Sequence, residues 1–396
     1  MFSLGIFGTR SFLARGREAK ALPPDLPAAW RLDVRALGFA HDPPREEFDT
    51  SLQLDPICFL TDETVVITFA TREAPAALPR RGEAGPNLPF RLHALFVNTQ
   101  SGRLQTTEEW PTASYDSRVL PATEGRFIVL TPDKLVLYSR QMELLKELDI
   151  SLSQRSMVGA WRPYVSPGGR AIVVGYEPKA GDAWEKYEWV SAEDLTVLQR
   201  WTVKGYSGLF NNISDDTLVS LSGGIRIREL NAPWRQICWS PQRPCGTSPQ
   251  FINNNVVFTH TDGGGPQYCS LIRTDGTILF RQDFAPSEAP ECRRLFAGLY
   301  PARPSADGRR FALPIGRFHG GSAFFDIGAK YALKQVMVFD LASRGWIARV
   351  DAKPLRVSSL WGLALSPDGS LLAFIDQDGT LWLFRIPEVT AAPSTQ

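Results

Sequence analysis

Short apolar runs separated by tight-turn signals recur along most of this chain. The clearest example is residues 361–386, WGLALSPDGSLLAFIDQDGTLWLFRI, where a Ser-Pro-Asp-Gly turn and an Asp-Gly turn separate three apolar runs. Apolar or alternating runs of about 4–8 residues that are bounded by such turns are typical of β-strands. This stretch therefore predicts three consecutive antiparallel strands.

A unit of this kind recurs from residue 52 onward. Each copy has an inner strand, a polar or glycine-containing turn, an apolar second strand, and a hairpin made of a third and a fourth strand. The turns are centred on residues 62, 124, 168, 215, 254, 307 and 368, so successive copies lie roughly 39 to 62 residues apart. Spacings close to or above the period of a propeller blade, repeated seven times, predict an all-β, seven-bladed β-propeller.

The two ends of the chain suggest how the ring closes. The last copy ends at Ile386 after only three strands, whereas Trp30–Phe39 alternates apolar and charged residues like a strand but has no hairpin partner after it. We therefore predict that Trp30–Phe39 pairs with Thr380–Ile386, completes the last blade and leaves no unpaired blade edge. The predicted organisation is an irregular tail at 1–28, one propeller domain at 29–387 and a disordered tail at 388–396.

Charge and hydropathy constrain the partners only weakly. The chain has 43 Lys and Arg against 42 Asp and Glu, a net charge of +1, which gives no reason to expect nucleic acid or an anionic membrane as a partner. No apolar run approaches the length of a membrane span. The first residues form a poor secretory signal, because Gly5 and Gly8 interrupt a short apolar run. We expect a soluble monomer, exported only if the start codon is wrongly assigned.

Five cysteines allow two interpretations. Cys58 stands alone, four others lie between residues 238 and 292, and no C-x-x-C spacing indicates a zinc ribbon or a thioredoxin-like site. Buried reduced thiols are the first interpretation. The second is disulfides formed in an oxidising compartment, for which we predict Cys238 with Cys245 and Cys269 with Cys292, leaving Cys58 reduced.

Part of the repeat resembles known propeller repeats. LALSPDGSLLAFIDQDGTLWLF, within residues 361–386, is similar to WD40-type and YVTN-type repeats, and Val336–Val350 resembles the outer hairpin of YVTN and quinoprotein-like repeats. Phe384-Arg385 occupies the position of the WD dipeptide, and the Gly-His pair is missing. The resemblance implies the propeller architecture. Such propellers include scaffolds, lactonases, dehydrogenases and peptidase-associated domains, so the resemblance implies no single activity.

The order of strands in known propellers implies which loops share a face. The loops between second and third strands, together with the connections between blades, would form a top face, and the turns between first and second strands a bottom face. Three of the top loops are long: Thr71–Pro89, Glu177–Lys186 and Gly316–Leu333. Long loops on a rigid scaffold often carry binding residues, although tolerated insertions are the alternative. The loop of the sixth blade is the main candidate, because Phe324 and Phe325 would be costly to leave in water.

The candidate binding residues are polar or aromatic and are expected near the sixth-blade side of the channel mouth. They are Arg317, His319, Asp326, Lys330 and Tyr331 in the sixth-blade loop, Arg293 and Arg294 in the connection before it, and His260 in the fifth blade. Arginine can bind a carboxylate or phosphate through two parallel hydrogen bonds, so the expected partner is an acidic protein segment or an anionic small molecule. The alternative is a solvated mixed-charge loop in which Asp326 neutralises Lys330.

Catalytic motifs are missing from the sequence. It contains no nucleophile elbow, P-loop, H-E-x-x-H or dinucleotide-binding glycine motif in the required context. His260, His319 and Asp262 could bind a metal ion, since imidazole and carboxylate suit several metals, but no cofactor is predicted. The leading hypothesis is a non-catalytic binding or interaction module that uses the top face and the channel mouth. The second hypothesis is a propeller-type hydrolase or oxidoreductase with a channel-mouth site, with or without a metal.

Overall fold

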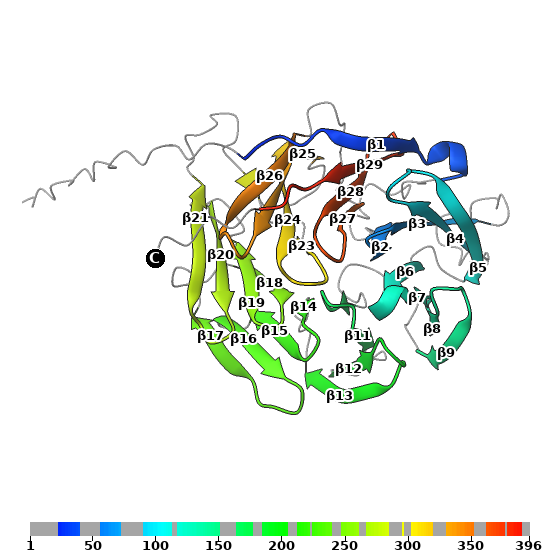
Figure 1. Ribbon diagram of the computed structural model, residues 1–396. Helices are drawn as coiled ribbons and strands as arrows, with labels where there is room; N and C mark the ends of the chain where they lie inside the picture. The colour runs from blue at the N-terminus through cyan, green and yellow to red at the C-terminus, as the bar shows by residue number, and fades with distance from the viewer. Residues whose placement is uncertain are drawn as a thin grey trace, which may run out of the picture.

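The computed structural model describes residues 23–39, 56–72, 90–112, 117–150, 164–176, 184–204, 212–221, 224–239, 247–260, 267–284, 295–296, 302–319, 330–351, 362–376 and 378–389. Their strands form seven antiparallel sheets that are arranged in a ring (Figure 1). The prediction of a seven-bladed, all-β propeller is therefore confirmed. Within the described ranges, no helix is both long and apolar enough to cross a membrane.

The first four blades each use four strands that are consecutive in sequence. Blade 1 contains β2 (Ile57–Thr61), β3 (Thr64–Arg72), β4 (Phe90–Asn98) and β5 (Leu104–Thr112). Blade 2 contains β6 (Arg118–Pro121), β7 (Phe127–Leu130), β8 (Lys134–Tyr138) and β9 (Leu144–Asp149), with the short 3-10 helix η2 (Thr123–Gly125) between the first two. Blade 3 contains β10 (Tyr164–Val165), β11 (Ala171–Tyr176), β12 (Trp184–Ser191) and β13 (Val197–Lys204). Blade 4 contains β14 (Asn212–Ile213), β15 (Thr217–Leu221), β16 (Gly224–Glu229) and β17 (Arg235–Trp239).

The last three blades include two departures from this pattern. Blade 5 is regular, with β18 (Thr247–Asn253), β19 (Val256–His260), β20 (Gln267–Arg273) and β21 (Ile278–Phe284). In blade 6 the inner strand is split, so that β22 (Leu295–Phe296) and β23 (Arg303–Pro304) both pair with β24 (Arg310–His319), which is followed by β25 (Lys330–Asp340) and β26 (Gly345–Asp351). Blade 7 takes its outer strand from the other end of the chain, in the order β27 (Leu363–Leu365), β28 (Leu371–Ile375), β29 (Thr380–Arg385) and β1 (Ala28–Asp33).

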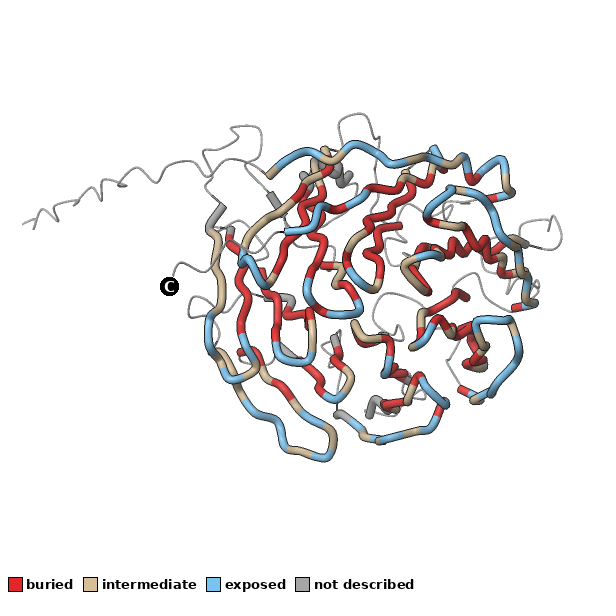
Figure 2. The backbone as a smooth tube through the Cα atoms, viewed as in Figure 1, coloured by how far each residue is buried: buried red, intermediate tan, exposed pale blue. Residues whose placement is uncertain are grey.

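Apolar side chains fill the layers between neighbouring blades. The second strands are the most buried, as in β28, where all five residues are buried, while the outer strand β9 is mostly exposed. Figure 2 shows this gradient from buried inner strands to exposed outer strands around the ring. The pattern follows from sequence, because a strand that is packed on both faces reads as a continuous apolar run.

The predicted closure between the two ends of the chain is confirmed. Strand β1 pairs antiparallel with β29, with Trp30 opposite Leu383 and Asp33 opposite Thr380 (Figure 1). The indole N–H of Trp30 also donates to the carbonyl of Thr99 in blade 1, at 2.7 Å. The first strand therefore completes blade 7 and also joins it to blade 1.

The closing strand is shorter than predicted. It ends at Asp33, whose carboxylate accepts the backbone N–H groups of Arg35 and Ala36, and the chain turns into the 3-10 helix η1 (Arg35–Leu37). An Asp side chain that bonds the following backbone in this way competes with strand pairing. The turn places Val34 and Phe39 in the apolar layer between blades 7 and 1, where they are 0% and 8% exposed.

The predicted boundary of the N-terminal tail also needs correction. Residues before β1 contact blade 6: the N–H of Leu26 donates to the carbonyl of Arg349 at 2.8 Å, and the N–H of Arg349 donates to the carbonyl of Pro24 at 3.0 Å. Asp25 forms a parallel bridge with Arg349. Residues 24–26, which were expected to be irregular, therefore contact β26 before the chain joins blade 7.

Candidate functional site

The predicted loop of the sixth blade is partly an extension of its strands. Strands β24 and β25, of 10 and 11 residues, are the longest in the described part of the chain. Gly316–His319 belongs to β24 and Lys330–Leu333 to β25, so the segment predicted as a loop at Gly316–Leu333 begins and ends as paired strand. The hairpin therefore continues the blade toward the top face.

The register of this hairpin groups three of the candidate residues. His319 lies opposite Lys330, and Arg317 lies opposite Ala332. Directly paired residues share a face of the sheet, as do alternate residues along one strand. Arg317, His319 and Lys330 therefore occupy positions on one face of the hairpin, and Tyr331, which is opposite Phe318, occupies the other face.

The same alternation identifies the neighbour of that face. Ile315 precedes Arg317 by two residues on β24 and packs in the apolar layer between blades 5 and 6. The bulge at this point skips one residue of β25, so the alternation along β24 is uninterrupted. The face that carries Arg317 and His319 is consequently the one directed toward blade 5. The structure describes the backbone of these residues and of Lys330 and Tyr331, but not their side chains.

His260 lies on the opposing side of this layer. It ends β19 opposite Cys269, shares its face with Phe258, and is only 3% exposed. The Phe258 ring contacts the Phe311 ring of blade 6, with centroids 5.3 Å apart. His260 is thus buried in the interface between blades 5 and 6, whereas the sequence analysis expected it among the binding residues at the channel mouth.

The remaining candidates fall outside the described residues. These are Arg293, Arg294, Asp326 and the possible metal ligand Asp262. Strand β22 begins immediately after Arg294 and pairs with Gly316 and Arg317. Within the described residues, no group of three or more His, Cys, Asp or Glu side chains is arranged as a metal site. The metal hypothesis built on His260, His319 and Asp262 stays untested.

The cysteines depart from the predicted pairing. Cys269 is a thiol and is 1% exposed, and Cys58 is also a thiol. Cys269 packs in the apolar layer between blades 5 and 6, which accounts for its burial, so the predicted pair of Cys269 with Cys292 is wrong for this structure. Cys238 is in a disulfide, while Cys245 and Cys292 lie outside the described residues.

A histidine in blade 1 has a defined hydrogen-bonded role. His93 lies on β4, where its Nε2 is 2.7 Å from the hydroxyl of Thr71 and its Nδ1 is 3.0 Å from a carboxylate oxygen of Glu109. Its ring stacks on Phe69, with centroids 4.8 Å apart. These three partners come from β3 and β5 on either side, so His93 is a cross-strand link of blade 1. His41 lies outside the described residues.

The turns between first and second strands, called the bottom turns here, repeat one hydrogen-bond pattern. In blade 7 the Ser366 hydroxyl donates to Asp368 at 2.7 Å and accepts the N–H of Leu371 at 2.9 Å. In blade 6 the Ser305 hydroxyl donates to Asp307 at 2.6 Å and accepts the N–H of Arg310. The Ser-x-Asp sequence therefore fixes each turn through its own side chains.

Blade 3 achieves the same arrangement with a residue from its neighbour. Gly168 occupies the position of the turn aspartate, and the Ser166 hydroxyl donates instead to Asp215 of blade 4, at 2.6 Å. A Cβ atom on Gly168 would approach the Asp215 carboxylate to 2.8 Å, so a larger residue here would displace that carboxylate from its present position. Asp215 thus belongs to the turn of blade 4 and also holds the turn of blade 3.

Hydrogen bonds connect the bottom turns from one blade to the next. The N–H of Asp215 donates to the side chain of Asn254 in blade 5, and the side chain of Asn253 donates to the carbonyl of Gly308 in blade 6. The N–H of Asp307 donates to the carbonyl of Pro367 in blade 7. The N–H of Asp368 then donates to the carboxylate of Asp62 in blade 1. Sequence reasoning used these residues as turn markers, but it missed that they link the blades.

Carboxylates at the junction of blades 7 and 1 influence each other. Burial raises the pKa of Asp62 above its ordinary value, and the nearby charges of Asp368 and Asp307 also raise it. Burial acts to raise the pKa of Asp368 too, but hydrogen bonds from Ser366 and Ser370 outweigh it and lower that pKa. The two carboxylates are therefore shifted in opposite directions, Asp62 toward its neutral form and Asp368 toward its charged form.

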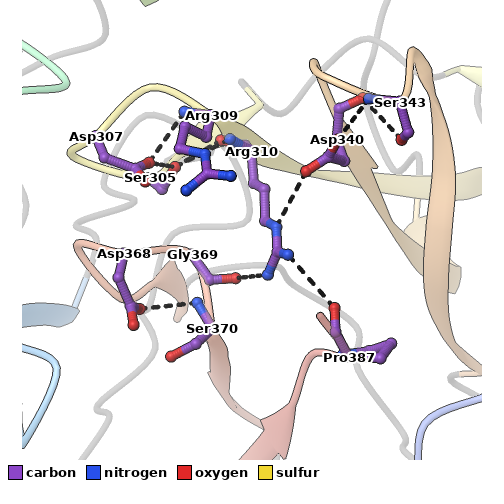
Figure 3. Close-up of polar contacts among 10 residues, drawn as sticks. All are labelled: Ser305, Asp307, Arg309, Arg310, Asp340, Ser343, Asp368, Gly369, Ser370 and Pro387. Carbon is purple, nitrogen blue, oxygen red and sulfur yellow. Dashed lines mark hydrogen bonds and ion pairs between the residues drawn. The ribbon is translucent and has the colours of Figure 1, made fainter. Parts of the chain in front are cut away.

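The buried residue Arg310 joins blade 6 to blade 7. Its Nε is 3.3 Å from Asp340, and its other nitrogens donate to the carbonyls of Gly369 and Pro387 at 3.0 and 3.4 Å (Figure 3). The Arg310 side chain is 10% exposed, and the Asp340 side chain is 3% exposed. Asp340 also accepts the N–H of Ser343 at 2.7 Å (Figure 3).

A recess opens on the bottom face beneath blade 5. It has a volume of about 570 Å³, and its walls are the bottom turns of blades 3, 4, 5 and 6 and the hairpin of β20 and β21. This volume is within the range of ligand sites in proteins. The recess, called the bottom recess below, was not predicted from the sequence, because the residues that line it come from four blades.

The fold of this chain is similar to that of solved structures. The chain is similar to the C-terminal WD40 domain of Sif2, with a TM-score of 0.50 and 12% identity over 93% of this chain and 100% of that chain. It is also similar to a chain in the crystal structure of a mitotic checkpoint complex, with a TM-score of 0.51 and 12% identity over 95% of this chain and 100% of that chain. No family model and no curated protein matches the sequence. The chain is therefore a seven-bladed β-propeller of WD40-like architecture.

Proposed function

We propose that the chain is a protein-interaction module that binds an acidic segment of a partner protein on its top face, at the sixth blade. The observation that carries this proposal is the extended hairpin of β24 and β25, whose register groups Arg317, His319 and Lys330 on the face directed toward blade 5. The similarity to a chain of the mitotic checkpoint complex, an assembly of proteins, supports an interaction role for a fold of this kind.

Physical reasons favour an acidic partner at this position. Two basic residues and a histidine on one face give a local positive potential in a chain whose net charge is only +1. Such a patch attracts carboxylates and sets orientation and association rate. Arg317 can hold a carboxylate through two parallel hydrogen bonds, while Lys330 supplies a point charge. The buried layer below, which contains His260 and Phe258, gives the hairpin a rigid base.

The test is a titration of the full chain with a fluorescein-labelled peptide that contains several glutamates in a Gly/Ser background. The double variant Arg317→Ala/Lys330→Ala should weaken binding by about tenfold or more, as expected for the loss of charge-assisted hydrogen bonds of ~1.5–3 kcal/mol. A control variant, Arg103→Ala/Lys146→Ala, removes the same charge from exposed positions on blades 1 and 2 and should change affinity less than about twofold.

Two results would contradict the proposal. The first is an affinity that is unchanged in the variant of the sixth blade. The second is an equal loss in both double variants, which would show that the peptide senses overall charge and not this hairpin. An anionic small molecule is tested in the same way, with inorganic phosphate as the competitor against the labelled peptide.

A further inference from the structure

The bottom recess contains functional groups that the proposed function does not use. Asp215 and Asp307, from the bottom turns of blades 4 and 6, lie at its end nearest the centre of the ring. Arg273 and Leu279, from the third and fourth strands of blade 5, lie at its end farther from the centre. The bottom turn of blade 5, which includes Asn255, lies between them.

The walls of the recess are fixed before any ligand arrives. Asp215 is held by the Ser166 hydroxyl at 2.6 Å and by its own N–H, which donates to Asn254 at 3.2 Å. Asp307 is held by the hydroxyl of Ser305 at 2.6 Å and the N–H of Arg309 at 3.0 Å. Because these side chains are already ordered, a ligand would bind without the entropy cost of immobilising them.

The inner end of the recess retains capacity for a cation. Among the described residues, neither Asp215 nor Asp307 forms an ion pair, and the second carboxylate oxygen of Asp307 has no hydrogen-bond partner. These two carboxylates are not part of any group of three metal-ligating side chains in the described chain. Carboxylates of this kind can hold a guanidinium or an ammonium group through charge-assisted hydrogen bonds.

The rest of the recess matches an extended peptide. Pro167 and Ala306 supply apolar surface on which the stem of an arginine or lysine can lie. Asn255 is exposed, and its side-chain amide can both donate to and accept from a peptide main chain. At the outer end, the Arg273 side chain is 48% exposed and forms an ion pair with Asp275 at 3.8 Å, an exposed contact that an acidic residue of a ligand would have to share or displace.

We propose that the bottom recess is a second binding site, which takes an extended peptide with a basic residue at Asp215 and Asp307 and an acidic residue at Arg273. The two faces of the propeller then bind segments of different charge, an acidic one above at blade 6 and a basic-then-acidic one below at blade 5. The chain would in this way hold two polypeptides, or two parts of one, on opposite faces.

The experiment measures fluorescence anisotropy of labelled peptides with the full chain. The probes are Gly/Ser peptides that carry one arginine and one glutamate at increasing separations, with an all-Gly/Ser peptide as the blank. Asp307→Asn keeps the oxygen that accepts from Ser305 and Arg309 but removes the charge, and it should weaken the best probe by about tenfold. Arg273→Ala should weaken it by a smaller factor, because Arg273 is half exposed.

The control is Asp378→Asn, which removes one exposed carboxylate from the turn between β28 and β29 on the opposite face. It should leave the affinity unchanged, as should Arg317→Ala/Lys330→Ala. The proposal is overturned if no probe binds more tightly than the blank, or if Asp378→Asn weakens binding as much as Asp307→Asn. Loss of binding in the Arg317→Ala/Lys330→Ala variant alone would also overturn it, by locating the peptide on the top face.

Discussion

Replacing Arg310 with methionine should destabilise the propeller more than any change to an exposed arginine. Methionine keeps the apolar stem but none of the donors that reach Asp340, Gly369 and Pro387 (Figure 3). Asp340, whose side chain is 3% exposed, would be left as a buried carboxylate without its guanidinium. Removing one partner of a buried ion pair costs ~3–5 kcal/mol, a large part of the ~5–15 kcal/mol that stabilises a typical domain.

The measurement is urea unfolding of the full chain, followed by circular dichroism. Arg140→Met is the matched control, because Arg140 pairs with Glu63 and both side chains are more than half exposed; it should cost less than about 1 kcal/mol. Adding Asp340→Asn to Arg310→Met should recover part of the loss, since the amide oxygen still accepts the N–H of Ser343 but carries no charge. A loss below about 1 kcal/mol for Arg310→Met, or a double variant less stable than the single one, would refute this reasoning.

The same pair should give the wild type a dependence on acid. Burial acts to raise the pKa of Asp340, but the hydrogen bonds from Ser343 and the charge of Arg310 outweigh it and lower that pKa below its ordinary value. A carboxylate with a lowered pKa contributes stability that is complete above the unfolded-state pKa and is lost as the pH falls through the folded-state pKa. The free-energy difference between wild type and Arg310→Met should therefore shrink in acid. A difference that grew in acid would contradict the assignment.

Three further predictions follow from the ring and its burial. Deleting residues 1–22 should leave the melting temperature unchanged. Deleting residues 1–39 removes β1 and two buried apolar side chains worth ~1.5–3 kcal/mol each, so it should cause aggregation or a lower melting temperature. If the longer deletion gives a monomer with an unchanged melting temperature, the closure by β1 is wrong. Asp62→Asn should stabilise the chain increasingly as the pH rises. Because the pKa of Asp62 is raised, the contribution of this carboxyl group to the free energy of unfolding is present in acid and lost toward neutrality. A loss of stability in Asp62→Asn at pH 7 would contradict this prediction. Cys269 should resist alkylation in the native chain and react in urea, and rapid native labelling would show that it is not buried.

The sequence patterns that predicted the fold are those that depend on local chemistry. Polar or glycine-containing turns could be recognised at seven positions, and those with a Ser-x-Asp sequence, such as Ser366 and Asp368, are fixed by their own side chains. The missing strand of the last blade predicted β1 as its partner for a physical reason, the cost of an exposed edge. The end of that strand was not predicted correctly. Asp33 fits the alternating pattern of a strand, but its carboxylate accepts the following backbone N–H groups and so competes with strand pairing.

The candidate sites were predicted less completely, because their groups come from different blades. Alternation along a strand could place Arg317 and His319 on one face, but only the register of β24 and β25 adds Lys330 to it. Burial of His260 depends on blade 6 packing against blade 5, which no local pattern contains. The bottom recess combines turns that are far apart in sequence, and its only sequence signal was the repeated Asp and Asn at the turn markers.

Amide hydrogen exchange of the full chain, with and without the glutamate-containing peptide, tests the central claim most directly. The measurement reports on the backbone of the hairpin itself. We predict slower exchange at residues 316–319 and 330–333 when the peptide is bound, with no change in the bottom turns of blades 4 to 6. Protection confined to the bottom turns or to the outer strands, with residues 316–319 and 330–333 unchanged, would contradict it.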